Sequence, residues 1–99
     1  MNRNIIVSEI AKILSVANNA EDIQNFIIEI LTESELETLS KRWQIIKMLS
    51  EGRTQRDIAK ELKVSLCKVT RGSHILKKKN SISAKYLRLE KQDNEQNKI

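Results

Sequence analysis

The sequence predicts an all-α fold of about six helices, in one domain that spans residues 1–99. The chain contains no proline and only two glycines, Gly52 and Gly72, whereas the turns of a β-protein usually need more of both. Apolar residues recur instead at the spacing of a helical face in successive segments. Asn, Ser and Thr residues stand just before these segments, where the N-caps of helices belong.

The first two predicted helices are amphipathic and aliphatic. The first covers residues 4–17, and its apolar face consists of Ile6, Ile10, Ile13, Leu14 and Ala17. Asn19 can cap the second helix, with Asp22 three residues further on. The apolar face of that helix consists of Ile23, Phe26, Ile27, Ile30 and Leu31. Together these faces exceed what the short helices that follow can cover, so we expect a homodimer.

The third predicted helix begins at a capping box and runs to about Ser50. The carboxylate of Glu35 can accept a hydrogen bond from the backbone N–H of Thr32, whose hydroxyl caps the helix in return. The main apolar positions of this helix are Leu36, Leu39, Trp43, Ile46 and Leu49. We expect Trp43, the only tryptophan, in the core. Gly52 is expected to end the helix in the left-handed conformation.

Residues 54–77 are typical of a helix-turn-helix. Thr54 can cap a first short helix, with Asp57 at its third helical position. Lys63 and Val64 then break the helical rhythm, and Ser65 supplies a second cap. Two short helices joined by so tight a turn cross steeply, which projects the second helix outward to where it can enter the major groove of DNA. The alternative is a helical hairpin inside an ordinary α-helical core.

A sixth helix is expected after the lysines at 77–79, which suit the negative end of the preceding helix. Ser81 or Ser83 can cap it. Its apolar residues are Ile82, Tyr86, Leu87 and Leu89. The residues from Glu90 to Ile99 are polar, and we expect them to form a frayed tail.

Positive charge is concentrated on the helix-turn-helix. Residues 53–85 carry ten basic and two acidic side chains, whereas residues 1–52 carry five basic and eight acidic ones. Phosphate backbones attract such a basic segment, so its coincidence with the motif favours nucleic-acid binding. The alternative is a solvated basic face that only keeps the protein soluble.

The composition disfavours several other classes of protein. A single cysteine, Cys67, excludes an intramolecular disulfide framework and fits a reducing cytoplasm, where we place the protein. With one histidine and no paired ligand spacing, we expect no metal site. No apolar run approaches the roughly 20 residues of a membrane span, and the N-terminal apolar run is too short for a signal peptide. We find no acid–base pair, nucleophile constellation or phosphate loop, so we expect no enzyme.

Docking of the motif on DNA predicts which side chains make contact. The start of the second motif helix would present base-contacting residues to the groove, namely Leu66, Cys67, Lys68 and Thr70. Lys68 could reach guanine O6 and N7, while Leu66 and Cys67 could contact thymine methyl groups. Gln55 and Arg56 should meet a phosphate or a base edge. Contacts with the DNA backbone are expected from Ser73, His74 and Lys77.

Residues 31–77 resemble the Trp repressor family. The most specific shared pieces are Thr-Gln-Arg-Asp-Ile at 54–58 and Thr-Arg-Gly-Ser at 70–73, the latter followed by Leu-Lys at 76–77. The resemblance implies an intertwined, all-helical homodimer that binds operator DNA when L-tryptophan occupies a pocket beside the motif. It also implies the side chains of that pocket.

By this resemblance, Arg42 and Arg71 would flank the indole ring, and Arg71 would meet the ligand's carboxylate together with Thr32. A guanidinium can stack on an aromatic ring and can pair with a carboxylate through two hydrogen bonds. Gly72 would leave room for the ligand. Leu31 and Ile75 complete the implied ligand-binding set.

The chain departs from the family pattern at positions that bear on the ligand. Ile75 stands where the family has a serine that helps to hold the ligand's amino group, and Glu29 replaces an apolar residue of the pocket. Lys63 replaces the usual glycine of the motif's turn, and one residue is missing near Arg53. The ligand is therefore L-tryptophan, an indole without an α-amine or another aromatic acid, unless the pocket binds nothing.

The sequence thus predicts a sequence-specific, DNA-binding transcriptional regulator, specifically a repressor, that is activated by L-tryptophan or a related aromatic acid. A regulator that needs no ligand is one alternative. A second is a basic helical module that binds RNA or an acidic protein partner, which predicts weak, sequence-independent binding to DNA.

Overall fold

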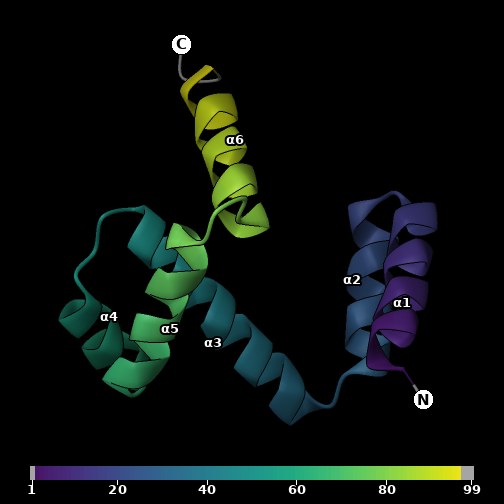
Figure 1. Ribbon diagram of the computed structural model, residues 1–99, viewed down its shortest axis with the longest axis horizontal. Coiled ribbons are helices and arrows are strands. Elements are labelled where there is room, and N and C mark those ends of the chain that lie inside the picture. The colour runs from purple at the N-terminus through teal and green to yellow at the C-terminus, as the bar shows by residue number, and fades with distance from the viewer. Residues whose placement is uncertain (1, 97–99) are drawn as a thin grey trace. The chain divides into compact units, whose positions relative to one another are not determined.

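The computed structural model describes the backbone of residues 2–96 and the side chains of residues 2–90, and the described part contains helices and no strand (Figure 1). The helices are α1 (Arg3–Ala17), α2 (Ala20–Ile30), α3 (Glu33–Ser50), α4 (Gln55–Leu62), α5 (Leu66–Lys77) and α6 (Ile82–Gln96). The prediction of an all-α chain of about six helices is confirmed. The contacts within the chain define two compact units, Met1–Leu36 and Glu37–Ile99. The grouping of all 99 residues into one domain stays a prediction.

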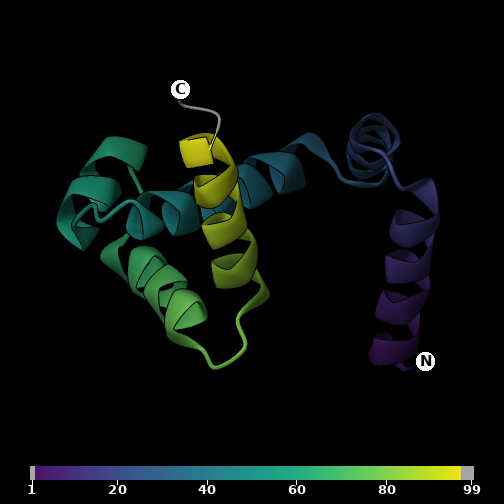
Figure 2. The same ribbon diagram turned by 90° about the horizontal axis from the view of Figure 1, so that it is seen from above.

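The first unit contains α1 and α2, joined through Asn18 in the left-handed conformation. The two helices contact each other, and Figure 2 shows α2 nearly end-on beside α1, so they cross. Neither helix has a buried residue. Their large apolar side chains that are more than half exposed are Ile5, Val7, Ile13, Val16, Ile28 and Ile30.

The predicted N-caps are present as hydrogen bonds. Asn19 Oδ1 accepts from the backbone N–H of Asp22 at 2.8 Å, which begins α2. At the start of α3, Thr32 Oγ1 accepts from the N–H of Glu35 at 3.1 Å, and a Glu35 carboxylate oxygen accepts from the N–H of Thr32 at 2.9 Å. The backbone N–H of Thr32, and then its side chain, hydrogen-bond to the Glu35 carboxylate and hold the pKa of Glu35 below its ordinary value.

The caps of the later helices follow the same pattern. The hydroxyls of Thr54 and Ser65 accept from the N–H groups of Asp57 and Lys68. For α6 the cap is Ser81, whose hydroxyl accepts from the N–H of Ala84 at 3.2 Å, and not Ser83.

Gly52 follows the C-terminal end of α3 and adopts the left-handed conformation, as predicted, with φ at +87°. Its N–H donates to the carbonyl of Leu49, and the N–H of Arg53 donates to the carbonyl of Met48, so two terminal carbonyls of the helix are satisfied. Arg53 also forms an ion pair with Glu61 of α4.

The core of the second unit joins α3, α4 and α5. It consists of Ile45, Ile58 and Val69, one from each helix, and both Ile58 and Val69 are fully buried. The apolar side chains packed against it are Met48, Leu49, Ala59, Leu62 and Val64. Burial of an aliphatic side chain contributes about 1.5–3 kcal/mol, so this cluster is what holds the helix-turn-helix on the C-terminal part of α3.

Trp43 is 43% exposed in the single chain. The prediction that it lies in the core is therefore wrong for this chain on its own. Trp43 lies two positions before Ile45, which is about 200° around the helix, so it does not share the face on which Ile45 meets Ile58 and Val69. Leu39, one turn earlier, is exposed on the same side. The helical periodicity of α3 identified its apolar positions, but it did not show which of them are buried by other residues of the same chain.

In α6, too, some of the predicted apolar side chains are buried and others are exposed. Leu87 is buried, whereas Ile82, Tyr86 and Leu89 are exposed. The helix continues through the polar residues from Glu90 as far as Gln96. The fraying of this tail stays a prediction. Residues 97–99 lie outside the described part.

Lys63 adopts the left-handed conformation, with φ 55° and ψ 47°, in the turn between α4 and α5. For a residue with a Cβ this conformation costs about 1–2 kcal/mol. We therefore expect Lys63→Gly to stabilise the fold by about 1 kcal/mol in chemical denaturation, after the greater entropy of glycine in the unfolded chain is deducted.

Asn80→Gly is the matched control for this substitution. Asn80 is also left-handed, with φ 61°, but asparagine adopts this conformation more readily than lysine. A smaller gain is expected there, and a gain at Asn80 as large as that at Lys63 would contradict the strain at Lys63.

Candidate nucleic-acid interface and adjoining pocket

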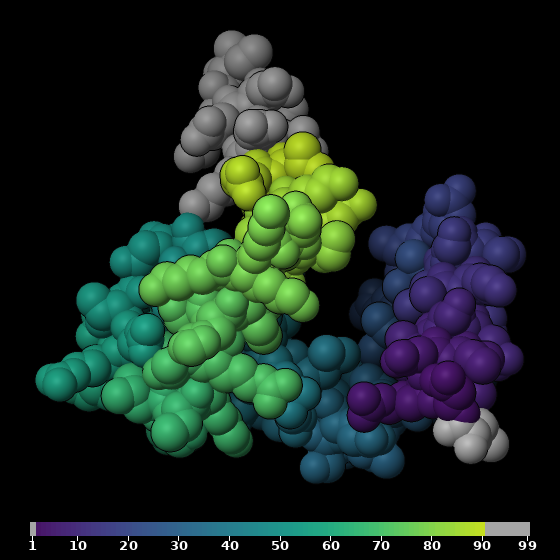
Figure 3. Space-filling view, in the orientation of Figure 1, coloured from purple at the N-terminus to yellow at the C-terminus, as the bar shows by residue number. Residues whose placement is uncertain are grey.

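The helix-turn-helix consists of α4, α5 and the three residues 63–65 between them. The N–H of Val64 donates to the carbonyl of Ala59 at 3.1 Å, which closes the end of α4. Ala59 and Val64 both pack against the core, so the turn is tied to the hydrophobic cluster. In the view of Figure 3 the surface of α5 continues directly into that of α4.

The start of α5 exposes the predicted groove-contacting side chains. Leu66, Cys67 and Lys68 are all exposed, and Leu66 is 47% accessible despite its apolar character. Arg56, His74 and Lys77, predicted to contact DNA elsewhere, are exposed as well. All ten basic side chains of residues 53–85 are exposed, so this segment presents its positive charge to solvent.

Thr70 does not fit its predicted role as an exposed DNA contact. It is half-buried, and its hydroxyl lies within hydrogen-bonding distance of Gln55 Oε1, at 2.9 Å, and of the Leu66 carbonyl, at 3.0 Å. A hydroxyl donates one proton, so it serves these two acceptors in turn. The physical reason is that position 70 faces α4, where its side chain links the two helices of the motif. Gln55 is correspondingly half-buried and held by this contact.

Ser73 was expected to touch the DNA backbone, but it is only 9% exposed. It lies on the inner face of α5 with Val69 and Gly72, at the i, i+3 and i+4 spacing of one helical face. Val69 and Gly72 of this face pack against α3. The side chain of Ser73 is buried beside them, which leaves it little surface for a phosphate.

Gly72 marks the closest approach of α5 to α3. A Cβ added there would lie 2.7 Å from Cγ2 of Ile45 and 3.3 Å from Cδ1 of Leu49. The resemblance implied that Gly72 leaves room for a ligand. The structure shows that the missing side chain makes room for α3, and the residue also lines the pocket described next, so its role beside a ligand stays a prediction.

A pocket of about 310 Å³ lies between α3 and α5, within the second unit. Its α3 wall consists of Glu37, Thr38, Lys41, Arg42, Ile45 and Ile46, and the rest of its lining consists of Val64, Lys68, Arg71, Gly72 and Ile75. The pocket thus brings together Arg42, Arg71, Gly72 and Ile75, four of the six residues predicted to bind a ligand. Leu31 and Thr32 belong to the other unit and are not among its lining residues.

The charge in this pocket is mainly positive. Four of its lining side chains are cations: Lys41, Arg42, Lys68 and Arg71. Its one carboxylate, Glu37, pairs with Lys41 of the next helical turn at 3.5 Å. The apolar part of the lining comes from Ile45, Ile46, Val64 and Ile75. Such a pocket suits a small molecule with an apolar body and an acidic group.

Sequence reasoning missed Lys41 and Lys68 as pocket residues. Lys68 had been assigned to DNA alone because it is exposed at the start of α5. The signal was present in the spacing, since Lys68, Arg71 and Ile75 recur at i, i+3 and i+7 on one face of a helix. Lys41 likewise precedes Ile45 by one turn.

The described residues include neither a membrane-spanning helix nor a cluster of metal-binding side chains. No helix among them is long and apolar enough to cross a membrane. Within the same part of the chain, no three His, Cys, Asp or Glu side chains cluster in a way that could hold a metal ion.

Comparison with known proteins identifies the family. The family model described as "Trp repressor protein" matches residues 7–91. The chain belongs to this family. It is 35% identical to the "Trp operon repressor homolog" of Xylella fastidiosa over 81 residues, which cover 81% of this chain and 88% of the relative. A protein with the same description from Chlamydia trachomatis is 41% identical over 56% of this chain and 60% of its own length. No solved structure matches the chain.

The comparisons support a repressor-type regulator. The family is named for transcriptional repressors and not for an enzyme activity. The family match extends over both units, so the α1–α2 unit is part of the family's domain and not an unrelated addition.

Substitution of Gly72 by alanine tests the close approach of the two helices. We expect a net loss of up to about 2 kcal/mol in unfolding free energy, because overpacking costs about 1–3 kcal/mol while alanine restores about 1 kcal/mol of helix propensity. Chemical denaturation followed by circular dichroism measures this loss.

Ile45→Leu provides the second arm of a double-mutant cycle, since leucine keeps the volume but has no Cγ2 methyl group. The loss caused by Gly72→Ala should shrink in that background. An unchanged loss would show that Cγ2 of Ile45 is not the obstacle.

Proposed function

We propose that this chain is a DNA-binding transcriptional repressor that acts as a homodimer and is activated by L-tryptophan or a related aromatic acid bound between α3 and α5. The observation that carries the proposal is the arrangement of α5. Its first turn exposes side chains suited to a DNA groove, while other residues of the same helix line a pocket suited to a small acid.

The electrostatics of the motif support DNA binding. The exposed basic side chains of residues 53–85 outnumber the acidic ones by eight, and one of the two acids, Glu61, is already paired with Arg53. Binding to DNA would release counterions from its phosphates, so the affinity should fall steeply with salt. Arg56 and Lys77 are exposed at positions where a docked motif meets the DNA backbone.

The exposed apolar faces support a homodimer. In α1 and α2, six large aliphatic side chains are at least half exposed, and Val16 reaches 83%. Leu39 and Trp43 of α3 and Tyr86 of α6 add further exposed apolar surface. A monomer in water would leave these surfaces solvated, whereas a second copy of the chain would bury them. A twofold protein would also match a twofold DNA site with two half-sites.

The pocket supports control by a small aromatic acid. Arg42 approaches it from α3 and Arg71 from α5, so a ring could lie between two guanidinium groups, and either group could pair with a carboxylate. A ligand held there touches the helix that is proposed to enter the groove. Ligand binding can therefore change DNA affinity to the extent that its contacts favour the DNA-bound arrangement of α5.

Fluorescence anisotropy with labelled duplexes tests DNA binding by the motif. Lys77→Ala should weaken binding to duplexes of unrelated sequence to the same degree, and should lower the slope of log affinity against log salt by about one, because one phosphate contact is lost. Lys12→Ala is the control, since Lys12 is also exposed but lies on α1. Equal effects of the two substitutions would contradict binding through the helix-turn-helix.

Sedimentation equilibrium tests the homodimer. We expect a dimer at micromolar concentration, and we expect Val16→Glu to shift it toward monomer, because the substitution would place a charge in the covered surface. Ser15→Glu adds the same charge one position away and should shift the equilibrium less. A monomer for the unsubstituted chain would overturn the dimer.

A further inference from the structure

A hollow of about 430 Å³ lies where α5 ends and α6 begins, within the second unit. Its lining comes from the last turn of α5, the connecting turn and the first two turns of α6. This α5–α6 hollow shares no residue with the pocket between α3 and α5. It also lies at the opposite end of α5 from the side chains proposed to enter a DNA groove.

Three of the side chains that line the α5–α6 hollow are cations, namely Lys78, Lys85 and Arg88, and none is an acid. All three are exposed to solvent. Nζ of Lys85 lies 5.5 Å from the centroid of the Tyr86 ring, a contact that leaves the charge of the ammonium in place. The lining therefore carries three positive charges and no negative one.

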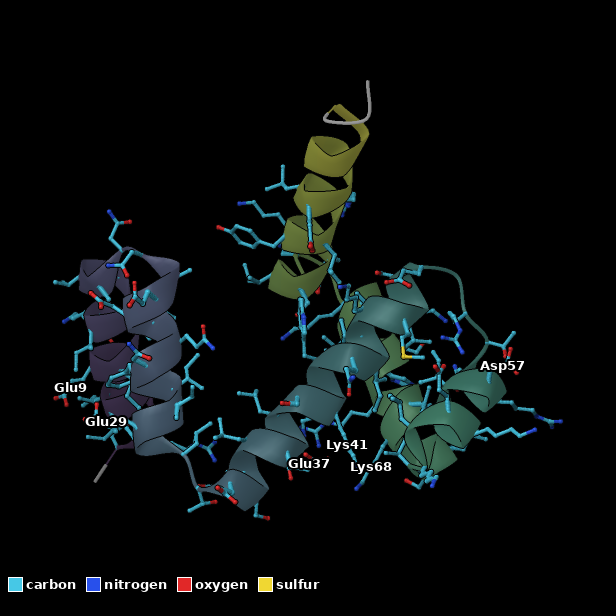
Figure 4. All side chains as sticks on the ribbon, turned by 180° about the vertical axis from the view of Figure 1, so that it is seen from behind. Glu9, Glu29, Glu37, Lys41, Asp57 and Lys68 are labelled. Atoms are coloured by element: carbon cyan, nitrogen blue, oxygen red, sulfur yellow. The ribbon has the colours of Figure 1, made fainter. Side chains whose placement is uncertain are left out.

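The surrounding chain does little to neutralise these charges. Residues 62–89 contain no Asp or Glu. Neither of the ion pairs described above involves one of the three cations. In Figure 4 the carboxylates labelled in this unit, Glu37 and Asp57, lie away from the start of α6. An anion in the hollow would thus be attracted by several cations without competing with a carboxylate of the protein.

The turn between the two helices brings Lys78 to the cations of α6. Asn80 is left-handed, and the N–H of Ser81 donates to the carbonyl of Lys78 at 3.1 Å. The hydroxyl of Ser81 then caps α6. On α6 itself Lys85 and Arg88 are three residues apart, which places them on one side of the helix. The backbone thus holds one cation of the turn and two of the helix around the same hollow.

The rest of the lining offers apolar surface to a ligand. Leu76, Ile82 and Ala84 contribute this surface. A second hollow of about 240 Å³ shares Leu76, Ala84 and Arg88 with the first and adds the buried Leu87. The guanidinium of Arg88 therefore borders both hollows. A ligand that pairs with it has an apolar wall beside its charged group, as small-molecule sites usually provide.

Phosphate groups suit this combination better than a carboxylate does. A phosphate monoester carries about 1.5–2 negative charges near neutral pH, whereas a carboxylate carries one. A guanidinium can hold two phosphate oxygens through parallel hydrogen bonds, and lysines add point charges. Three cations around one hollow are therefore matched by two linked phosphates.

We propose that the α5–α6 hollow binds the diphosphate group of a small organic molecule, such as a nucleoside diphosphate, through Lys78, Lys85 and Arg88. The apolar wall favours a small organic molecule over the backbone of DNA, which has no apolar body to place there. This site goes beyond the proposed function, since it requires neither DNA binding nor an aromatic acid.

Calorimetric titration with ADP and with adenosine tests the site. Both probes have the same organic body, but only ADP carries a diphosphate. The titrations are made at low ionic strength and without divalent cations, which would compete for the phosphates. We expect ADP to bind at one site per chain, at least about tenfold tighter than adenosine.

Substitution of the lining cations tests where ADP binds. Lys78→Gln and Arg88→Gln should each weaken ADP binding by about tenfold, because each removes a charged partner of the phosphates. Lys79→Gln is the matched control, since Lys79 is the next residue and is exposed but does not line the hollow. Circular dichroism of the three variants checks that the fold is retained.

Fluorescence anisotropy with a labelled duplex separates a free diphosphate from the DNA backbone. For a free diphosphate, Lys78→Gln should change the salt dependence of DNA binding no more than Lys79→Gln does. If the backbone is the occupant instead, Lys78→Gln and Arg88→Gln should each lower the slope of log affinity against log salt by about one, with no effect of Lys79→Gln.

Three results would overturn the proposal. The first is equal binding of ADP and adenosine, or binding of neither. The second is an equal loss of ADP binding in Lys78→Gln and Lys79→Gln, which would show a general effect of positive charge and not a site in the hollow. The third is the lowered salt slope without ADP binding, which would assign these cations to DNA.

Discussion

The close approach of α5 to α3 at Gly72 is the constraint on which the rest of the second unit depends. A Cβ at this position would lie 2.7 Å from Cγ2 of Ile45, so a side chain here would push the two helices apart. With α5 held this close, Ile45 and Val69 meet Ile58 in one buried cluster, which also fixes α4. The geometry of the helix-turn-helix is therefore set from its inner side, and its outer side is left exposed to solvent.

Helical geometry lets α5 serve three environments at once. Val69, Gly72 and Ser73 face the core, while Leu66 and Cys67 are exposed at its start. A third set of its residues, Lys68, Arg71 and Ile75, lines the pocket. Because one rigid helix joins these sets, a ligand that shifts α5 by a small amount would also shift the side chains presented to DNA. The pocket and the surface proposed to bind DNA are thus mechanically linked through a single helix.

Much of the fold could be predicted because it depends on local interactions. The capping box of Thr32 and Glu35 and the left-handed Gly52 are encoded within a few residues, so the helix ends followed from the sequence. The environments of Trp43, Thr70 and Ser73 could not be predicted in the same way. Each lies on a helix whose periodicity was recognised, but burial depends on which neighbour covers a given face, and that is a property of tertiary packing. The two-sided position of Lys68 was missed for the same reason. Arg42 and Arg71, by contrast, line one pocket. Their role in holding a ligand followed only from the resemblance to the family and stays a prediction.

Selection of bound duplexes from a random DNA library by the unsubstituted protein tests the central claim most directly. The account holds that two copies of an exposed α5 read DNA in a fixed relation to each other. It predicts an enriched sequence with two related half-sites whose centres lie about one helical turn, roughly 10 base pairs, apart. Failure to enrich any sequence, with binding that depends only on salt, would contradict a sequence-specific repressor and would favour a basic module that binds other partners.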